Sequence, residues 1–369
     1  MTDIALFLAA FVLFALVLSV LIVAHEWGHF FVARRLGVRV ERFSIGFGPI
    51  LIRRVWSGTE FCVSLVPLGG YVKLSGENPR ESQGAEWEFH GRPHWQRALI
   101  VLAGPVLNAV LAFVVFSGIF MAGRPVTTSR VGGVLEGYPA QEAGIEAGDV
   151  IVSINGEPIR LWEELLWAIR GQPADQLLVG FRREGDLHEV AMHPRAEFED
   201  ERVGKARRIG RIGIRPSEET VLIRFPFFQA IYMGAERVVL LTGLILSSVW
   251  MMITGVLPFR ESFTGPIGIF FLTQQMAEMG WIPLLNFVAL LSVSLFVLNL
   301  FPIPVLDGGH LLFIGIEALS GRRLSEKVKE KSAQVGFCLL MVLILFVIYQ
   351  DLERYEILAK LISFFSSSE

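Results

Sequence analysis

The sequence predicts a polytopic α-helical membrane protein with about four transmembrane helices, an inserted α+β domain and a membrane-associated β-hairpin region. Of its 369 residues, 53% are apolar and only 19% are charged, whereas soluble domains are usually about a quarter charged. The chain contains 29 Phe and 8 Trp, which suit a bilayer and its interfaces. A net charge of −3 gives no reason to expect a nucleic-acid partner, and two separated cysteines exclude a disulfide framework or a thiolate metal site. We therefore expect the lipid bilayer to surround much of the protein.

Five apolar stretches approach or reach the length of about 20 residues that a helix needs to cross the hydrocarbon. They cover residues 4–24, 98–122, 238–257, 281–306 and 335–349. The first stretch has no basic segment before it and no small-residue cleavage site after it. We therefore interpret it as a transmembrane helix and not as a signal peptide.

Clusters of arginine and lysine predict how these stretches are oriented. Between Arg34 and Arg54, directly after the first stretch, there are six arginines and one glutamate. A second basic cluster, 322–331, follows the stretch 281–306. Because short cytoplasmic loops carry an excess of basic residues, we place both clusters in the cytosol and both termini outside.

Residues 124–200 have the character of a folded domain outside the membrane, with Gly-rich turns and ordinary charge density. Alternating apolar residues predict short strands, and Asn155-Gly156 is a strong hairpin signal. We expect strands at 131–135, 149–154, 177–182 and 187–192, and helices at 138–143 and 161–170.

The segment His25-Glu-Trp-Gly-His29 has the spacing of a zinc site and lies at the cytosolic end of the first apolar stretch. Residues i and i+4 share one face of a helix, so His25 and His29 can hold one zinc ion while Glu26 lies beside them. A carboxylate next to a zinc site can accept the proton of an activated water. Ionisable groups at the edge of the hydrocarbon are costly and usually functional, which argues against a merely solvated helix end.

A catalytic zinc ion needs a third protein ligand and an open fourth position. Asp307 is the candidate, in the segment Asn299-Leu-Phe-Pro-Ile-Pro-Val-Leu-Asp-Gly-Gly-His310 at the cytosolic end of the fourth apolar stretch. Pro302 and Pro304 interrupt a helix there, and irregular backbone at membrane depth is tolerated where it lines a cavity. The interruption can bring Asp307 and Asn299 toward the metal, while His310 is a competing ligand.

This ligand set also determines the expected topology. If both 238–257 and 281–306 crossed the membrane, His25 and Asp307 would lie on opposite sides and could not share one zinc ion. We therefore expect 238–257 to lie on, or dip into, the outer face, which leaves four spans. The predicted segments are the first transmembrane helix with the zinc motif (1–36), a membrane-associated β region with a cytosolic loop (37–95), the second transmembrane helix (96–123), the extracytoplasmic domain (124–200), a linker with interfacial or re-entrant amphipathic helices (201–280), the third transmembrane segment (281–320), a basic cytosolic loop (321–332), the fourth transmembrane helix (333–350) and an extracytoplasmic tail (351–369).

Taken together, these motifs resemble the site-2 protease family of intramembrane zinc metalloproteases, in particular its bacterial RseP type. The resemblance rests on HEWGH near the N-terminus, on NLFPIPVLDGGH near the C-terminus, and on residues 139–156, which are similar to a circularly permuted bacterial PDZ domain. Further matching segments are 43–49, 67–74 and 103–108. The best-known members of this type carry two PDZ-like domains, whereas this sequence shows the pattern of one.

The resemblance implies a multi-pass protein of the bacterial cytoplasmic (inner) membrane, with the PDZ-like domain outside and the active site near the cytosolic side. It implies one zinc ion on His25, His29 and Asp307, Glu26 as the general base, and Asn299 and Pro302 near the substrate. Single-span membrane proteins, of the anti-sigma-factor or signal-peptide-remnant kind, would be cut after an upstream site-1 protease has trimmed them outside. No nucleic acid is expected as a partner.

Two parts of the chain allow a functional and a plainer interpretation. Strands are expected at 45–52 and 60–66, and their edge could hold an unwound substrate by strand addition or simply belong to a hairpin packed on the cytosolic face. The PDZ-like domain could bind peptide segments or only restrict access to the site.

Two other classes of function fit parts of the sequence. A membrane-anchored PDZ adaptor could carry a non-proteolytic zinc site, but structural zinc is usually closed by four protein ligands, and Glu26 would then have no role. A zinc transporter should carry ionisable residues within several spans, and the second and last apolar stretches have none. Metal-assisted peptide hydrolysis is the function that uses all the motifs.

Overall fold

The computed structural model describes residues 2–78, 82–172, 175–198, 208–258 and 263–356 of the chain. The chain forms two compact units, of which the first consists of Met1–Ile119, Phe228–Trp250 and Pro258–Glu369. The second consists of Phe120–Phe227 and Met251–Leu257. Most of the predicted tail 351–369 lies outside the described residues.

Five helices of the described chain are long and apolar enough to cross a membrane. They are α1 (Thr2–Arg35), α2 (His94–Ala122), α5 (Phe227–Ile253), α8 (Trp281–Asn299) and α10 (Glu326–Arg354). Length and composition alone therefore do not separate the four predicted spans from α5. Helix α10 begins inside the predicted loop 321–332, because its first turns are rich in Lys and Glu, which are good helix formers.

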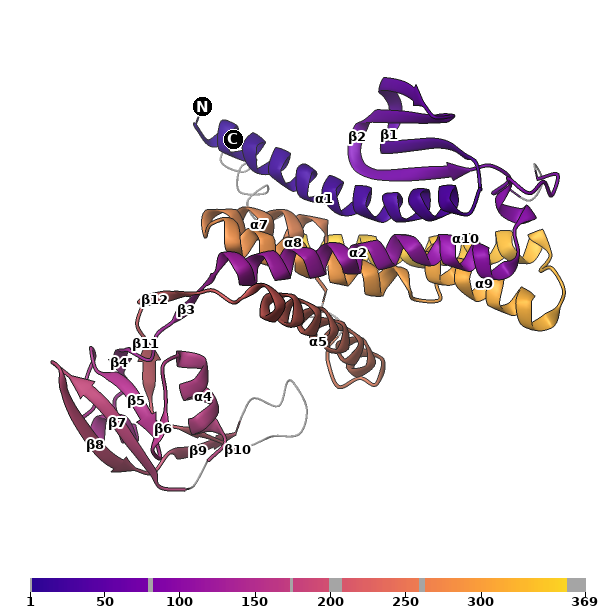
Figure 1. The fold of residues 1–369 in the computed structure, drawn as a ribbon. Coiled ribbons are helices and arrows are strands. Elements are labelled where there is room, and N and C mark those ends of the chain that lie inside the picture. Colours follow the sequence, from indigo (N-terminus) through magenta and orange to yellow (C-terminus); the bar gives the residue numbers. More distant parts are fainter. Residues whose placement is uncertain (1, 79–81, 173–174, 199–207, 259–262, 357–369) are drawn as a thin grey trace, which may run out of the picture. The chain divides into compact units, whose positions relative to one another are not determined.

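The first unit is a bundle in which α1 and α2 are antiparallel and α8 packs on both (Figure 1). Gly28 of α1 allows the close approach, because a Cβ atom there would lie 2.2 Å from the carbonyl oxygen of Ala103 in α2. Val17, Leu21 and Val288 form a buried cluster farther along the same helices. The short helices α7 (Pro266–Glu278) and α9 (Asp307–Ser320) precede and follow α8.

Two long antiparallel strands, β1 (Val40–Trp56) and β2 (Thr59–Leu74), form the predicted β region between α1 and α2. Bulges let β2 fold around β1, so that residues 42–45 of β1 pair with 60–63 on one side and 70–73 on the other. Residues 70–74 thereby become an edge of this sheet. Gly70 brings that edge against α1, since a Cβ atom there would lie 3.5 Å from Cγ of Glu26.

The second unit is an α+β domain built on a four-stranded sheet, whose strands in spatial order are β6 (Glu157–Pro158), β5 (Val150–Ile154), β7 (Leu177–Arg183) and β8 (Asp186–Met192). Its core contains the fully buried residues Ile151, Leu165, Leu177 and Val179. The predicted strands and helices between 131 and 192 are all present. The elements of the domain are β3 (Arg124–Thr127), β4 (Val131–Val134), α3 (Pro139–Glu142), β5 (Val150–Ile154), β6 (Glu157–Pro158), α4 (Trp162–Arg170), β7 (Leu177–Arg183), β8 (Asp186–Met192), β9 (Arg195–Phe198), β10 (Arg208–Arg211), β11 (Ile214–Pro216) and β12 (Thr220–Ile223).

The domain extends beyond the predicted boundary at residue 200. Strands β10, β11 and β12 pair back onto β9, β4 and β3, respectively. These strands have only three or four residues each, which is too few for a visible alternation of apolar side chains. The predicted linker 201–280 therefore contains the last strands of this domain as well as α5 and α7.

Candidate metal centre

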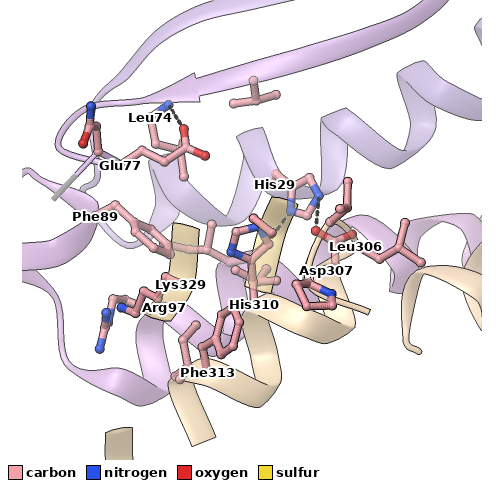
Figure 2. Close-up of a pocket in the computed structure, with 18 of the residues that line it drawn as sticks. His29, Leu74, Glu77, Phe89, Arg97, Leu306, Asp307, His310, Phe313 and Lys329 are labelled. Atoms are coloured by element: carbon pink, nitrogen blue, oxygen red, sulfur yellow. Dashed lines mark hydrogen bonds and ion pairs between the residues drawn. The ribbon is translucent and has the colours of Figure 1, made fainter. Parts of the chain in front are cut away.

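Three side chains with metal-ligating atoms meet between α1 and the start of α9. His25 and His29 lie one turn apart on α1, and Asp307 is the first residue of α9. Nε2 of His25 lies 3.1 Å from Oδ2 of Asp307, and Nε2 of His29 lies 3.6 Å from Oδ1. The two Nε2 atoms are 3.2 Å apart (Figure 2 shows His29 and Asp307). The structure thus brings together the three ligands expected from the sequence.

Helix α2 orients both histidines from behind. Nδ1 of His29 lies 2.8 Å from the carbonyl oxygen of Ile100, so the Nδ1–H donates to that oxygen and leaves the Nε2 lone pair free for a metal. Nδ1 of His25 faces the amide of Asn108 at 3.4 Å. The amide oxygen of Asn108 is buried and has no partner among the described residues. Turning the amide over would let this oxygen accept the Nδ1–H of His25, which would fix both imidazoles in the metal-binding tautomer.

The break between α8 and α9 positions Asp307. Residues 300–306 leave the helical path, and α9 restarts at Asp307. Glycine is needed immediately afterwards, because a Cβ atom on Gly308 would lie 2.2 Å from the carbonyl oxygen of Phe301. Gly309 has the same restriction, with the carbonyl oxygen of Ile303 at 2.3 Å. The Asp-Gly-Gly segment therefore folds back tightly and points its carboxylate at the histidines.

Glu26 lies next to the ligand triad without belonging to it. Its carboxylate lies near His25, His29 and Asp307, and it accepts a hydrogen bond from the backbone N–H of Val72 in β2. A carboxylate held beside a metal site, with no ligand role of its own, is available to accept and donate a proton.

The site opens into a cavity of about 580 Å³. The cavity is lined from α1, α2, β2, α8, α9 and α10 and from the break between α8 and α9, and Figure 2 shows His310, Phe313, Arg97 and Lys329. Asn299 and Pro304 also line it. Asn299 and His310 therefore line the same cavity as the triad, while Pro302 is not among the lining residues and Pro304 is.

Glu77 is a lining residue that the sequence did not reveal. It follows β2 and accepts a hydrogen bond from the backbone N–H of Leu74 at 3.2 Å (Figure 2). Burial raises the pKa of the Glu77 carboxyl above its usual value. A single glutamate in a polar loop carries no sequence signal that could have placed it here.

The donor set fits a catalytic zinc ion. Two imidazole nitrogens and one carboxylate oxygen are ligands that zinc accepts, and catalytic zinc sites typically have three protein ligands and one open position. In the described part of the chain, these three residues are the one group of at least three His, Cys, Asp or Glu side chains close enough to hold a metal. The remaining side of the triad faces the cavity.

The model of peptidase family M50 matches residues 13–343. Regulator of sigma-E protease RseP of Escherichia coli is 30% identical, with 92% of this chain and 98% of that protein aligned. Protease RseP of Yersinia pestis is 32% identical over 94% and 98% of the two chains. Zinc metalloprotease RasP of Oceanobacillus iheyensis is 29% identical over 93% and 98%.

Among solved structures, the PDZ domain of an SdrC-like protein of Listeria monocytogenes is similar to 24% of this chain and 86% of its own length, with 20% identity and a TM-score of 0.20. The family predicted from the sequence motifs is confirmed by the family model and the curated relatives. The chain belongs to peptidase family M50, the site-2 protease family of zinc metalloproteases.

Proposed function

We propose that this protein is an intramembrane endopeptidase that cuts single-span membrane proteins, with one zinc ion held by His25, His29 and Asp307. The observation that carries the proposal is the position of Glu26, beside the triad in a shared cavity but outside the ligand set. An adaptor with a structural zinc ion would need a fourth protein ligand, and the described residues supply three.

The side chains of the site divide the chemistry between them. When bound, zinc would polarise the scissile carbonyl and make a water molecule easier to deprotonate. Glu26 takes the proton of that water on a carboxylate oxygen and passes it to the nitrogen of the leaving amine. His29 keeps its orientation through Ile100. Asn299 lines the cavity, and its side-chain amide donates a hydrogen bond to the negatively charged oxygen that develops from the scissile carbonyl.

The outer edge of β2 offers a place for an unwound substrate. A peptide bond in a helix is already hydrogen-bonded, so a spanning helix must open before it is cut. Residues 70–73 pair with β1 on one side. On the other side, the backbone N–H of Val72 donates a hydrogen bond to Glu26. An extended segment that adds to this edge would pass directly beside the proton acceptor.

Four spans with both termini outside agree with the packing of the first unit. Helices α1 and α2 are antiparallel, so the start of α1 and the end of α2 lie at one end of the bundle. Gly234, near the start of α5, packs on Ser117 near the end of α2. Helix α5 therefore begins at this end, which we propose is the outer end.

Helix α7 begins at the same end of the bundle. Its Phe270 packs on Phe7 and Phe14 of α1, and the N–H groups of Gly265 and Gly268 donate to Asp351, near the end of α10. If α5 crossed the membrane, residues 254–264 would have to cross back, and they are far fewer than the about 20 that a helix needs. We therefore propose that α5 stays on the outer side.

Cysteine labelling tests this topology. Single cysteines would be placed at Gly156, Phe263 or Arg322 in a chain lacking Cys62 and Cys338. Intact cells that produce each variant would then be treated with a membrane-impermeant thiol reagent. We expect labelling at 156 and 263 and none at 322 until the membrane is permeabilised. Labelling at 156 and 322 but not at 263 would mean that α5 crosses the membrane.

We further propose that the protein lies in the bacterial cytoplasmic (inner) membrane with the PDZ-like domain outside, and that an upstream protease trims its substrates first. Co-expression with a doubly tagged single-span reporter, whose spanning helix contains Gly and Pro near its middle, tests the activity. We expect a shortened fragment with the wild type and none with Glu26→Gln, which keeps both histidines. Equal cleavage by the two proteins would remove Glu26 from the mechanism.

A further inference from the structure

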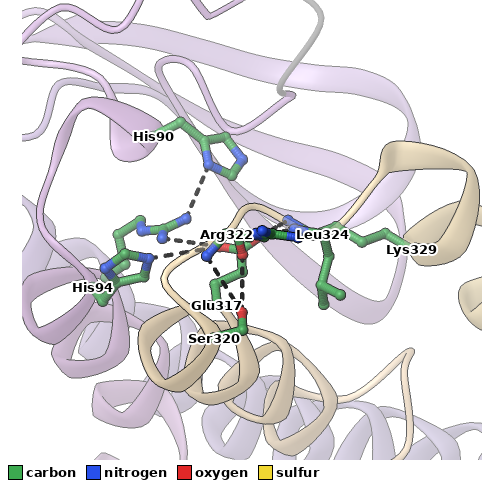
Figure 3. A network of polar contacts seen from close by, with 8 residues as sticks. His90, His94, Glu317, Ser320, Arg322, Leu324 and Lys329 are labelled. Carbon is green, nitrogen blue, oxygen red and sulfur yellow. Dashed lines mark hydrogen bonds and ion pairs between the residues drawn. The ribbon is translucent and has the colours of Figure 1, made fainter.

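A buried carboxylate lies next to two residues that line the cavity, Arg97 and Lys329. Glu317 of α9 is 1% exposed and is held by Nη2 of Arg97 at 3.1 Å and Nζ of Lys329 at 2.6 Å (Figure 3). The backbone N–H of Leu324 donates at 3.1 Å to Oε1, the oxygen that Lys329 also contacts, while Arg97 contacts Oε2. A carboxylate so deeply buried is stable only while it is paired and hydrogen-bonded.

Arg97 makes a second contact that leads away from Glu317. Its Nη1 lies 3.1 Å from Nδ1 of His90, in the short 3₁₀ helix η1 (Phe89–Gly91) (Figure 3). Burial, together with the charges of Arg97 and Lys329, lowers the pKa of His90 to about 4. His90 is therefore neutral at pH 7, its Nδ1 accepts from Arg97, and the ring is also hydrogen-bonded to the backbone of Glu77.

The segments joined by Arg97 are those that build the zinc site. Glu317 lies on α9, which begins with Asp307. Arg97 itself lies one turn before Ile100, whose carbonyl oxygen orients His29. His90 reaches the turn after β2, whose edge faces Glu26.

We propose that Arg97 is a positioning residue for peptide hydrolysis: its contact with Glu317 places Asp307 relative to the histidines, and its contact with His90 places the edge of β2 relative to Glu26. The inference rests on the zinc site proposed above. Arg97 is 5% exposed, and one planar guanidinium serves both contacts through two different nitrogens. A lysine has a single ammonium group in place of the planar guanidinium. It can therefore keep the ion pair with Glu317, but it cannot contact Glu317 and His90 at the same time.

The two contacts predict different effects on zinc binding and on turnover. Zinc affinity would be measured by competition with a chelating fluorophore, and kcat and KM by cleavage of the purified reporter described above. We expect Arg97→Met to lower both zinc affinity and kcat by about tenfold or more. Arg97→Lys should keep the zinc affinity within about twofold and still lose about tenfold in kcat.

The contact with His90 has its own pair of variants. His90→Phe keeps an aromatic ring beside Phe89 but removes the acceptor, so we expect wild-type zinc affinity and a kcat lowered by about tenfold. His90→Gln restores an acceptor for Arg97 and should recover most of the kcat. A residue that only stabilised the fold would not show this rescue at constant zinc affinity. These two variants keep the proposal testable if Arg97→Met does not fold.

Arg211→Gln is the matched control, because it removes an exposed arginine that pairs with Glu197 in the second unit. It should leave zinc affinity and kcat unchanged. The inference is overturned if Arg97→Lys and His90→Phe behave like this control, or if they lower zinc affinity as much as they lower kcat. His25→Ala, measured in parallel, separates a failure of the proposed zinc site from a failure of the proposed role of Arg97. This variant should lose zinc, and if it kept zinc the ligand assignment itself would be wrong.

Discussion

A methyl group on Gly104 should disrupt the zinc site without removing any ligand atom. Gly104 lies on α2 next to both histidines. A Cβ atom there would lie 2.2 Å from Nε2 and 2.5 Å from Cε1 of His29, and 2.9 Å from Cε1 of His25. The His29 ring cannot simply turn away, because its Nδ1–H is held by the carbonyl oxygen of Ile100 at 2.8 Å.

The required movement is larger than a zinc site tolerates. Ordinary van der Waals contact for a Cβ atom begins at 3.4 Å, so the ring would have to retreat by more than about 1 Å. Zinc–ligand distances are held to within about 0.2 Å. We therefore expect Gly104→Ala to lower zinc affinity by well over tenfold, roughly the upper range for changes around metal ligands. Helix propensity works in the opposite direction, since Ala is about 1 kcal/mol more favourable than Gly inside a helix.

Zinc content of the purified protein and cleavage of the reporter would measure the effect. Gly118→Ala is the matched control, because it lies on the same helix and a Cβ atom there meets nothing within 4 Å. We expect the control to keep zinc and activity and to be as stable as the wild type or more so. Full zinc content and normal cleavage by Gly104→Ala would refute the packing argument.

Three further predictions follow from other contacts. Asp307→Ala should lose zinc in elemental analysis while His310→Ala largely keeps it, and the reverse would mean that the third ligand is misassigned. Asp149 is 2% exposed, and its carboxylate accepts a hydrogen bond from Nε of Arg183 at 2.8 Å within the second unit. Asp149→Ala removes the hydrogen bonds from Arg183 and from the backbone N–H of Glu146, so it should destabilise that unit by about 1.5–3 kcal/mol. The loss would be seen as faster hydrogen exchange there at unchanged zinc content, and unchanged exchange would contradict this. Because His90 keeps a pKa of about 4 when folded and titrates near 6.5 when unfolded, the unfolded state binds the extra proton between these values. The melting temperature should therefore fall as the pH drops from 6.5 toward 4, and it should fall less in His90→Phe; parallel curves would be the contrary result.

The local parts of the site were predictable from the sequence. The spacing of His25 and His29 fixes their shared face on a helix, and Pro302 and Pro304 predict a break in the chain before Asp307 at membrane depth. Both predictions depend on neighbours within a few residues. The side chains of Asn299 and His310 were likewise expected near the site, and both line the cavity.

The long-range parts of the site were not predictable. Arg97 and Glu317 are 220 positions apart, and nothing in either local sequence selects the other as its partner. His90 and Glu77 lie in polar segments without periodicity, so their positions depend on the three-dimensional path of β2. Helix α5 has the length and composition of a span, and the sequence argued against a crossing only through the shared ligand set of His25 and Asp307. The contact of Gly234 with α2, and the contacts between the start of α7 and the end of α10, support the same placement.

The zinc K-edge absorption spectrum of the purified protein tests the central claim most directly. One zinc ion on His25, His29 and Asp307 predicts nitrogen and oxygen neighbours at about 2.0–2.1 Å, with the outer-shell pattern of two imidazoles. The pattern should drop to one imidazole in His29→Ala. A sulfur neighbour at about 2.3 Å, or an imidazole pattern that His29→Ala leaves unchanged, would contradict the account.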